Sequence, residues 1–369
     1  YDLRAQYAKL ATIEMTPDTS FLTEEEREVV NLLIEASGYM DEIYLRQRGA
    51  QLPQLRETIS RSRRADRDLL VAMFDRNFGP WDEVAELRPF WGTQPMPKGA
   101  GFYPADLTRE EFDAYLAANP DQREALTNPY TVVERRGDGF VGVPYSQAYR
   151  EWLVPAARLL EQAAERTSNP SLKRFLSLRA KSFLSDDYFE SEMAWMDLQD
   201  TPIEIAIGPY EVYTDRLYGT KTAFESFVTL RNPEESAALA KYKNSLRTME
   251  KNLPIPDEHK NFQRGFESPI AVADQVHGGG DNVPGTQTIA FNLPNDERVR
   301  EAKGAKKVIL ANVLGAKYDR ILAPMADVVL KDDQAALVAK KYMEANTLFH
   351  ELSHSLGPGT ITGDGRQTT

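Results

Sequence analysis

The chain contains no cysteine, so disulfides, thiolate nucleophiles and cysteine-ligated zinc sites are all excluded. It also lacks a G-x-S-x-G sequence, which leaves no candidate for a serine nucleophile. No apolar run is long enough to span a bilayer, and we expect no membrane contact. Positive charge is in deficit, because 44 Lys and Arg accompany 56 Asp and Glu for a net charge of −12. That balance argues against nucleic acid as a partner.

The residues that are present predict a two-domain α+β protein. A length of 369 residues and a hydrophobic content of 41% are typical of about two domains with cores of their own. Helical patterns cover residues 1–80, with a capping box at Thr23-Glu24-Glu25-Glu26 and a second helix from about Leu55 to Asn77. Helices resume over about 145–198, and a charged helical stretch is predicted at about 233–251.

Strand signals are short and scattered, without a βαβ rhythm. Tyr130–Glu134 and Phe140–Val143 flank Gly137-Asp138-Gly139, which predicts a hairpin. Gly278-Gly279-Gly280 before Asp281 predicts a flexible loop. The other strand-like pieces are Ile203–Ile207, Val212-Tyr213, Phe227–Leu230, Ile270–Val276 and Thr288–Phe291.

Two of only four histidines lie in the sequence His350-Glu351-Leu352-Ser353-His354. We expect this H-E-x-x-H motif on a helix over about 335–356, which Gly357-Pro358-Gly359 ends. Positions i and i+4 share a helix face, so both imidazoles can reach one Zn²⁺ while Glu351 acts on a water. The alternative is a pair of ordinary helical histidines. Two histidines also leave a tetrahedral zinc one protein ligand short.

Several further segments, together with this motif, resemble the dipeptidyl peptidase III family of zinc metallopeptidases. The resemblance is to the branch found in bacteria and as the C-terminal part of plant Nudix-fused proteins, and it extends from about residue 100 to 361. The segments that carry it, besides the His350 helix, are Gly101–Pro104, Val143–Ser146, Phe183–Tyr188, Ala194–Asp197, Ile207–Tyr213 and Phe291–Asp296.

The resemblance implies a mostly helical, two-lobed α+β fold with a wide cleft. The lower lobe would contain a small β-barrel, and the helical upper lobe would carry the zinc motif. We expect residues 1–231 and 270–320 in the lower lobe, and 232–269 and 321–369 in a truncated upper lobe.

The resemblance also implies roles for residues of this chain. His350 and His354 would bind Zn²⁺, Glu351 would be the general base and Tyr213 would stabilise the oxyanion. Glu211 would bind the N-terminal ammonium of a short peptide, and Asn292 and Asn295 would bind its N-terminal end and backbone. From the residues alone, Tyr213 reads as a strand-edge tyrosine packed with Tyr210 and Tyr218, and the asparagines read as turn residues around Pro294.

The third zinc ligand of the family is a glutamate in a downstream E-E-x-x-A-(D/E) motif, and no such motif precedes Thr369. We therefore expect a fragment of a longer protein, with the third ligand beyond Thr369. The function predicted is a zinc exopeptidase that releases dipeptides from peptide N-termini. The alternatives are a same-fold zinc peptidase with another cleavage position and a non-catalytic peptide-binding protein. We expect a cytoplasmic location, with an exported form left open, and the sequence indicates no oligomeric state.

Overall fold

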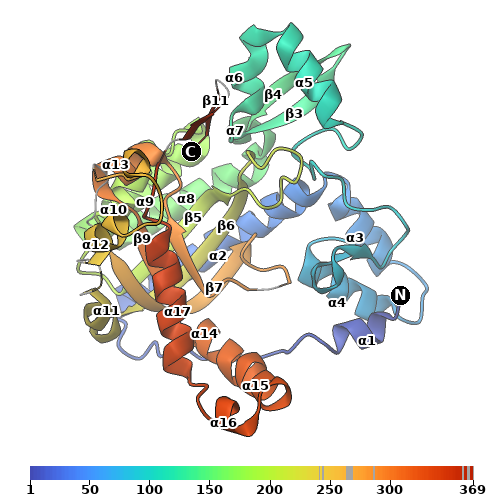
Figure 1. Cartoon of the computed structure of the whole chain (residues 1–369). Helices are drawn as coiled ribbons and strands as arrows, with labels where there is room; N and C mark the ends of the chain where they lie inside the picture. The colour runs from blue at the N-terminus through green and yellow to red at the C-terminus, as the bar shows by residue number, and fades with distance from the viewer. Residues whose placement is uncertain are drawn as a thin grey trace.

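The computed structural model describes residues 1–240, 242, 245–262, 269–285, 287–359, 361–363 and 366–368. Helices dominate, and the predicted α+β class is confirmed (Figure 1). The helices are α1 (Leu3–Tyr7), α2 (Glu24–Arg48), α3 (Leu52–Ser60), α4 (Arg67–Asn77), α5 (Arg109–Ala118), α6 (Arg123–Thr127), α7 (Tyr145–Ala148), α8 (Arg150–Arg166), α9 (Pro170–Ser185), α10 (Phe189–Met196), α11 (Pro233–Ala240), α12 (Leu246–Lys251), α13 (Glu297–Lys303), α14 (Ala311–Lys317), α15 (Ala323–Val329), α16 (Asp332–Ala335) and α17 (Lys340–Ser353).

In the part of the chain that the structure describes, the strands form one five-stranded sheet and three two-stranded sheets. They are β1 (Trp81–Asp82), β2 (Arg88–Pro89), β3 (Thr131–Arg136), β4 (Gly139–Pro144), β5 (Ile203–Glu211), β6 (Ala223–Asn232), β7 (Ile270–Gly280), β8 (Ala290–Leu293), β9 (Lys306–Leu310), β10 (Ile361–Gly363) and β11 (Arg366–Thr368). The large sheet has the order β5-β6-β7-β9-β8, with β7 and β9 parallel and the other neighbours antiparallel. The resemblance implies a small barrel, whereas the described strands form an open sheet with β5 and β8 as its end strands.

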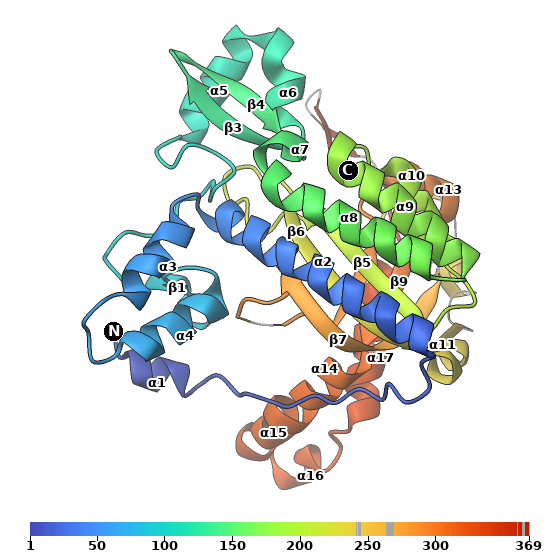
Figure 2. The same cartoon turned by 180° about the vertical axis from the view of Figure 1, so that it is seen from behind.

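The sheet is covered by helices on both faces. Helix α2 contacts β6 and β7 on the face seen in Figure 2, with α8 packed beside it. Helices α14 and α17 lie on the opposite side, toward the viewer in Figure 1. The capping box of α2 forms as predicted, because Glu26 N donates to Thr23 Oγ1 and Thr23 N donates to the Glu26 carboxylate. None of the described helices is long and apolar enough to cross a bilayer.

Two helix predictions were wrong in their bounds. The helix expected over about 55–77 is broken into α3 and α4, because Ile59, Leu70 and Phe74 all bury in one cluster and the chain must turn back between them. The helix that carries the zinc motif begins at Lys340 rather than near residue 335, since Ala339 is extended. Asp332 and Asp333, which precede it in the sequence, belong to the separate short helix α16.

The strands differ from the predictions at three places. Val212 and Tyr213, predicted as a strand, follow the end of β5 in a turn. Strand β9 was not predicted, because its sequence has no alternating pattern. The glycines expected in a flexible loop are the last residues of β7. Gly280 has φ +65°, and a Cβ there would lie 2.1 Å from the backbone oxygen of Phe224. Glycine at this position therefore allows β7 to approach β6 closely.

Candidate active site

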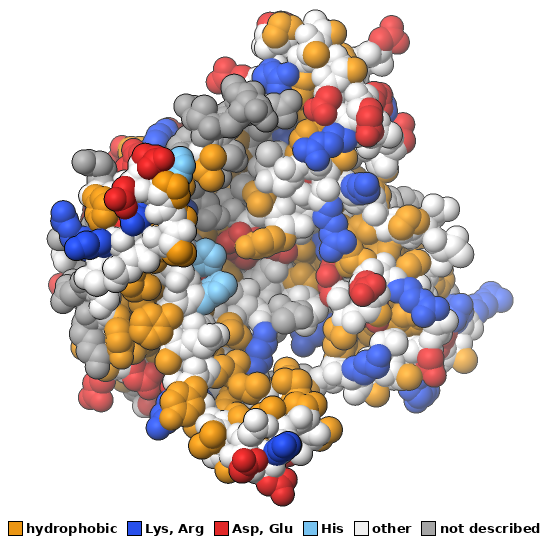
Figure 3. All heavy atoms as spheres, viewed as in Figure 1, with side chains coloured by type: hydrophobic (Ala, Val, Ile, Leu, Met, Phe, Trp, Pro, Cys, Tyr) orange, Lys and Arg blue, Asp and Glu red, His pale blue; other side chains and the backbone are white. Residues whose placement is uncertain are grey.

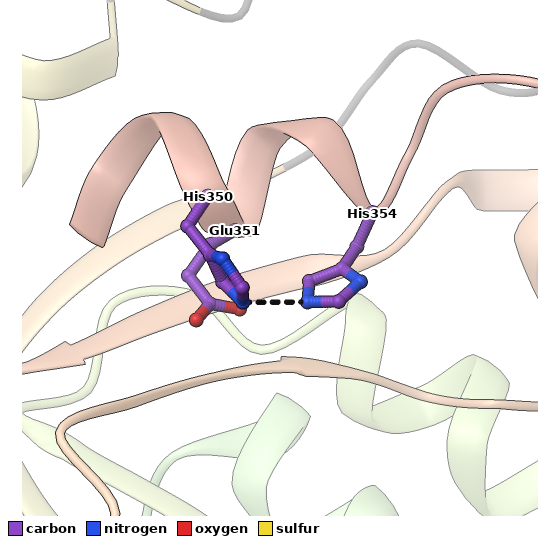
Figure 4. A group of neighbouring side chains, drawn as sticks. All are labelled: His350, Glu351 and His354. Carbon is purple, nitrogen blue, oxygen red and sulfur yellow. Dashed lines mark hydrogen bonds between the residues drawn. The ribbon is translucent and has the colours of Figure 1, made fainter. Parts of the chain in front are cut away.

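Helix α17 presents the zinc motif on its outer side. Leu348 and Leu352 are buried against Ile309 of β9 and Leu246 of α12, which anchors the inner side of the helix. The histidines lie on the exposed side, with His354 at the C-cap of the helix, while Glu351 is buried. Both imidazoles point to one place, beside the Glu351 carboxyl group (Figure 4). The packing of α17 thus sets the direction of the motif.

The geometry of the two histidines suits a shared metal ion. Their Nε2 atoms lie 3.1 Å apart, and one ligand atom from each of His350, Glu351 and His354 falls within 4.8 Å of the others. Two imidazole nitrogens about 2.0–2.1 Å from a tetrahedral zinc would be separated by about 3.3 Å. In the described parts of the chain, this is the one group of three such side chains close enough to hold an ion.

Glu351 sits in surroundings that suit a general base. Burial raises the pKa of its carboxyl group to about 7, and the nearby Lys307 ammonium offsets part of that rise. Lys307 lies in β9 and donates to Ser355, which follows the motif directly. A carboxyl group with a pKa near 7 can both accept and release a proton at neutral pH.

All seven site residues predicted from the sequence line one cavity of about 530 Å³. Two lie in strands β5 and β8, two in the segments that directly follow these strands, and three in α17 or at its C-cap. Figure 3 shows histidine and acidic side chains gathered around a hollow in this face of the molecule. The seven are Glu211, Tyr213, Asn292, Asn295, His350, Glu351 and His354.

Glu211 is the last residue of β5 and faces this cavity. Burial raises the pKa of its carboxyl group to about 7, the charge of Asp281 adds to that rise, and a hydrogen bond with Asn295 opposes it. Glu211 forms no ion pair with any residue in the described ranges. A desolvated carboxylate without an ion-pair partner among the described residues can bind the cationic group of a ligand.

The other three predicted residues differ in how firmly they are held. Tyr213 is 76% exposed and makes no ring contact with Tyr210 or Tyr218 among the described residues, so the strand-edge alternative does not describe it. Asn295 donates its amide to the backbone oxygen of Tyr210 at 3.1 Å. Both amide atoms of Asn292 are buried without a partner in the described structure, so they can bond to a ligand.

The structure adds cavity residues that the sequence did not indicate. Glu225 is deeply buried and Asp281 is partly buried, and burial raises the pKa of each carboxyl group. Arg300 lines the cavity and donates to the His354 backbone oxygen at 2.6 Å. Asp281 directly follows the run Gly278–Gly280, and this run was the one feature of the sequence that could have drawn attention to Asp281. A second cavity of about 830 Å³ adjoins the first, and Glu211, Tyr213, Asn295 and Arg300 line both.

Comparison with known proteins agrees with the family resemblance inferred from the sequence. The model of peptidase family M49 matches residues 107–361, which include every predicted site residue. The chain belongs to peptidase family M49. The resemblance inferred from the sequence is therefore confirmed, and the M49 region contains β5, β8 and α17, the elements that build the cavity.

Solved structures extend the similarity to almost the whole chain. Dipeptidyl peptidase III from Caldithrix abyssi is 50% identical with a TM-score of 0.90, over 99% of this chain and 70% of its own. The enzyme from Corallococcus sp. strain EGB is 39% identical with a TM-score of 0.94, over 99% of this chain and 68% of its own.

Curated relatives of this M49 chain are longer than it is. A protein named Nudix hydrolase 3 from Arabidopsis thaliana is 31% identical over 100% of this chain and 54% of its own length. The chain therefore spans about half the length of that relative.

Proposed function

We propose that this chain carries the substrate cleft of a zinc-dependent exopeptidase that releases dipeptides from the N-termini of short peptides. The observation that carries the proposal is the buried Glu211 carboxyl group in the same cavity as His350, Glu351 and His354. A peptide ammonium held at Glu211 would fix the distance from the N-terminus to the metal. The names of the solved relatives agree with this reading.

Each predicted residue has a role in this scheme. Zn²⁺ held by His350 and His354 would supply Lewis acidity and lower the pKa of a water. Glu351 takes a proton from the attacking water at its carboxylate oxygen and gives it to the leaving amine nitrogen. The Tyr213 phenol donates a hydrogen bond to the scissile carbonyl oxygen as negative charge develops there. The charge of Glu211 raises the pKa of Tyr213, so the phenol keeps its proton at neutral pH.

The edge of the sheet can bind the backbone of a peptide. Strand β8 is an end strand, and its residues Ala290, Phe291 and Asn292 line the cavity. An extended peptide beside an end strand can form main-chain hydrogen bonds with it. The free amide of Asn292 and the Glu211–Asn295 pair then lie near the peptide's N-terminal end.

We also propose two lobes around the cavity. The lower lobe would comprise residues 1–231 and 270–320, and the truncated upper lobe would comprise residues 232–269 and 321–369. Closure of the two lobes would exclude water from the cavity during catalysis. The third zinc ligand would be a glutamate beyond Thr369, because the described residues supply only the two histidines and Glu351.

A ladder of synthetic peptides tests the proposed cleavage position. The intact gene product should contain about one zinc per chain and release dipeptides from free N-termini, while N-acetylated peptides should stay uncut. Glu351→Gln should abolish cleavage with zinc still bound. Glu211→Gln should raise KM for free peptides severalfold or more.

The ladder also separates the alternatives. Release of single residues would favour a same-fold zinc peptidase with another cleavage position. Peptide binding without zinc or cleavage would favour the non-catalytic protein, an alternative that the two-histidine set motivates. Full activity of Glu351→Gln would contradict the mechanism.

A further inference from the structure

The turn between β5 and β6 carries Tyr213 near its start, and this inference rests on the function proposed for that tyrosine. Because the Tyr213 side chain is 76% exposed, few neighbours hold its ring in place. Its location therefore depends on the backbone of residues 212–222. Glu211 differs, since it belongs to β5 and pairs with Ala223 of β6 in the sheet.

One buried carboxylate organises this turn. Asp215 is 2% exposed, and its Oδ1 atom accepts the backbone N–H groups of Leu217 and Tyr218, each at 3.0 Å. Its Oδ2 atom accepts the backbone N–H groups of Thr220 and Lys221, also at 3.0 Å. Four backbone donors of one turn thus converge on a single side chain two residues after Tyr213.

The turn is also tied to the rest of the molecule. Tyr103 donates its phenol hydrogen to Asp215 Oδ2 at 3.1 Å, and Arg216 N donates to the Lys98 backbone oxygen at 2.9 Å. The ammonium of Lys221 is fully buried and donates to the backbone oxygens of Leu126 and Asn128 at 2.8 and 2.7 Å. These bonds fix the far end of the turn to the segment before β3.

The near end is fixed by Thr214, which lies between Tyr213 and Asp215. Its hydroxyl group donates to Asp281 Oδ1 at 3.4 Å and lies 3.2 Å from the Tyr44 hydroxyl group. Both neighbours belong to the cavity wall. The backbone on which Tyr213 stands is therefore held on both sides, while the ring itself remains accessible to a substrate.

We propose that Asp215 is a positioning residue for catalysis, which places the Tyr213 phenol against the scissile carbonyl by holding the turn through four backbone hydrogen bonds. Asp215 acts only through Tyr213 and does not line the cavity. Loss of its carboxylate lets the turn relax, and the phenol then misses the carbonyl oxygen. Substrate binding at Glu211 is unaffected, because the sheet holds that residue.

A double-mutant cycle with tetra-alanine as substrate tests this proposal on the intact gene product. Tyr213→Phe should lower kcat by about 10²–10³, the usual effect of losing one oxyanion donor. Asp215→Asn should lower kcat about tenfold or more with little change in KM. In the Tyr213→Phe background, Asp215→Asn should lower kcat no further, because the group that it positions is already gone.

The outcomes separate this inference from the proposed function. An Asp215→Asn loss of equal size in both backgrounds would show a purely structural role and overturn the inference. Wild-type kcat in Asp215→Asn would do the same. Full activity in Tyr213→Phe would overturn the role of the tyrosine itself and, with it, the inference.

Two more variants keep the inference testable if Asp215→Asn does not fold. Tyr103→Phe removes the phenol bonds to Asp215 Oδ2 and to the Thr220 hydroxyl group but keeps the Asp215 carboxylate, and we expect a smaller kcat loss that again vanishes in the Tyr213→Phe background. A persistent loss there would count against the inference even if Asp215→Asn fails to fold. Asp113→Asn is the matched control: this exposed residue accepts the Tyr218 hydroxyl at 2.8 Å on the outer side of the same turn, and kcat should stay unchanged.

Discussion

At the scale of single residues, the cavity is unusual for its concentration of buried carboxyl groups. Burial raises the pKa of Glu211 and Glu351 to about 7, and it raises those of Glu225 and Asp281 as well. Each of these groups costs folding free energy when ionised, because burial favours the neutral form. Such a cost is typical of functional sites, where a charge is kept for a ligand rather than for stability.

Glu211 gives a test of that cost. Its folded-state pKa of about 7 exceeds its ordinary value of 4.5, so the folded chain loses stability as pH rises from about 4.5 to 7. Glu211→Gln removes the charge, and we expect the variant to be ~2 kcal/mol more stable than wild type at about pH 8. Below about pH 4 the difference should disappear.

Urea denaturation at the two pH values measures this difference. Glu190→Gln is the control, because Glu190 is exposed, and it should leave stability unchanged at both pH values. A Glu211→Gln variant less stable than wild type at the higher pH would contradict the reasoning.

At the scale of elements, α17 shows how packing sets the site. Its apolar residues Leu348 and Leu352 face a small cluster with β9 and α12, and this contact turns the histidines outward. The H-E-x-x-H spacing predicted a helix and one shared face for both imidazoles. The direction of that face toward β5 and β8 depends on residues distant in sequence, so the motif alone could not reveal it.

The packing of α17 can be tested at Leu352, which is fully buried. Leu352→Ala leaves a cavity between α17 and the sheet, and we expect a loss of about 2–5 kcal/mol in unfolding free energy. Leu337→Ala makes the same change at a residue that is 72% exposed and should cost less than about 0.5 kcal/mol. Equal losses in urea denaturation for the two variants would show that α17 is not held by this cluster.

Strand β9 shows why some elements could not be predicted from the sequence. All five of its residues are buried, yet it begins with Lys306 and Lys307, a pair of residues that is typical of a solvent-exposed segment. The structure buries Lys306 by pairing its ammonium with Glu204 at 3.0 Å and with the Trp195 backbone oxygen at 2.8 Å. Only these tertiary partners make a buried lysine acceptable.

At the scale of the whole molecule, the chain is acidic, with a net charge of −12. Five carboxyl side chains and three arginines line the candidate cavity, but burial raises the pKa of four of these carboxyl groups. The net charge of the whole chain, rather than the cavity lining, therefore sets the field. A field of this sign attracts cationic peptides over distances set by the Debye length.

This field predicts a dependence on salt. At about 10 mM salt, where the Debye length is about 30 Å, Ala-Ala-Ala-Lys should have a severalfold lower KM than Ala-Ala-Ala-Ala. At about 1 M salt, where that length is about 3 Å, the two KM values should converge. Steady-state kinetics at both salt concentrations measure the effect. A KM ratio that does not change with salt would mean that the lysine is recognised by contact rather than by the field.

The sequence by itself determined the α+β class, the resemblance to the dipeptidyl peptidase III family, the H-E-x-x-H motif on a helix and the identity of seven candidate residues. These features depend on local spacing and on short motifs, which one chain carries in full. Only the tertiary structure decided that the seven residues share one cavity, that Glu211 is desolvated and that Asp215 holds the turn beneath Tyr213. Burial and convergence arise from contacts between residues far apart in sequence, so no local pattern contains them.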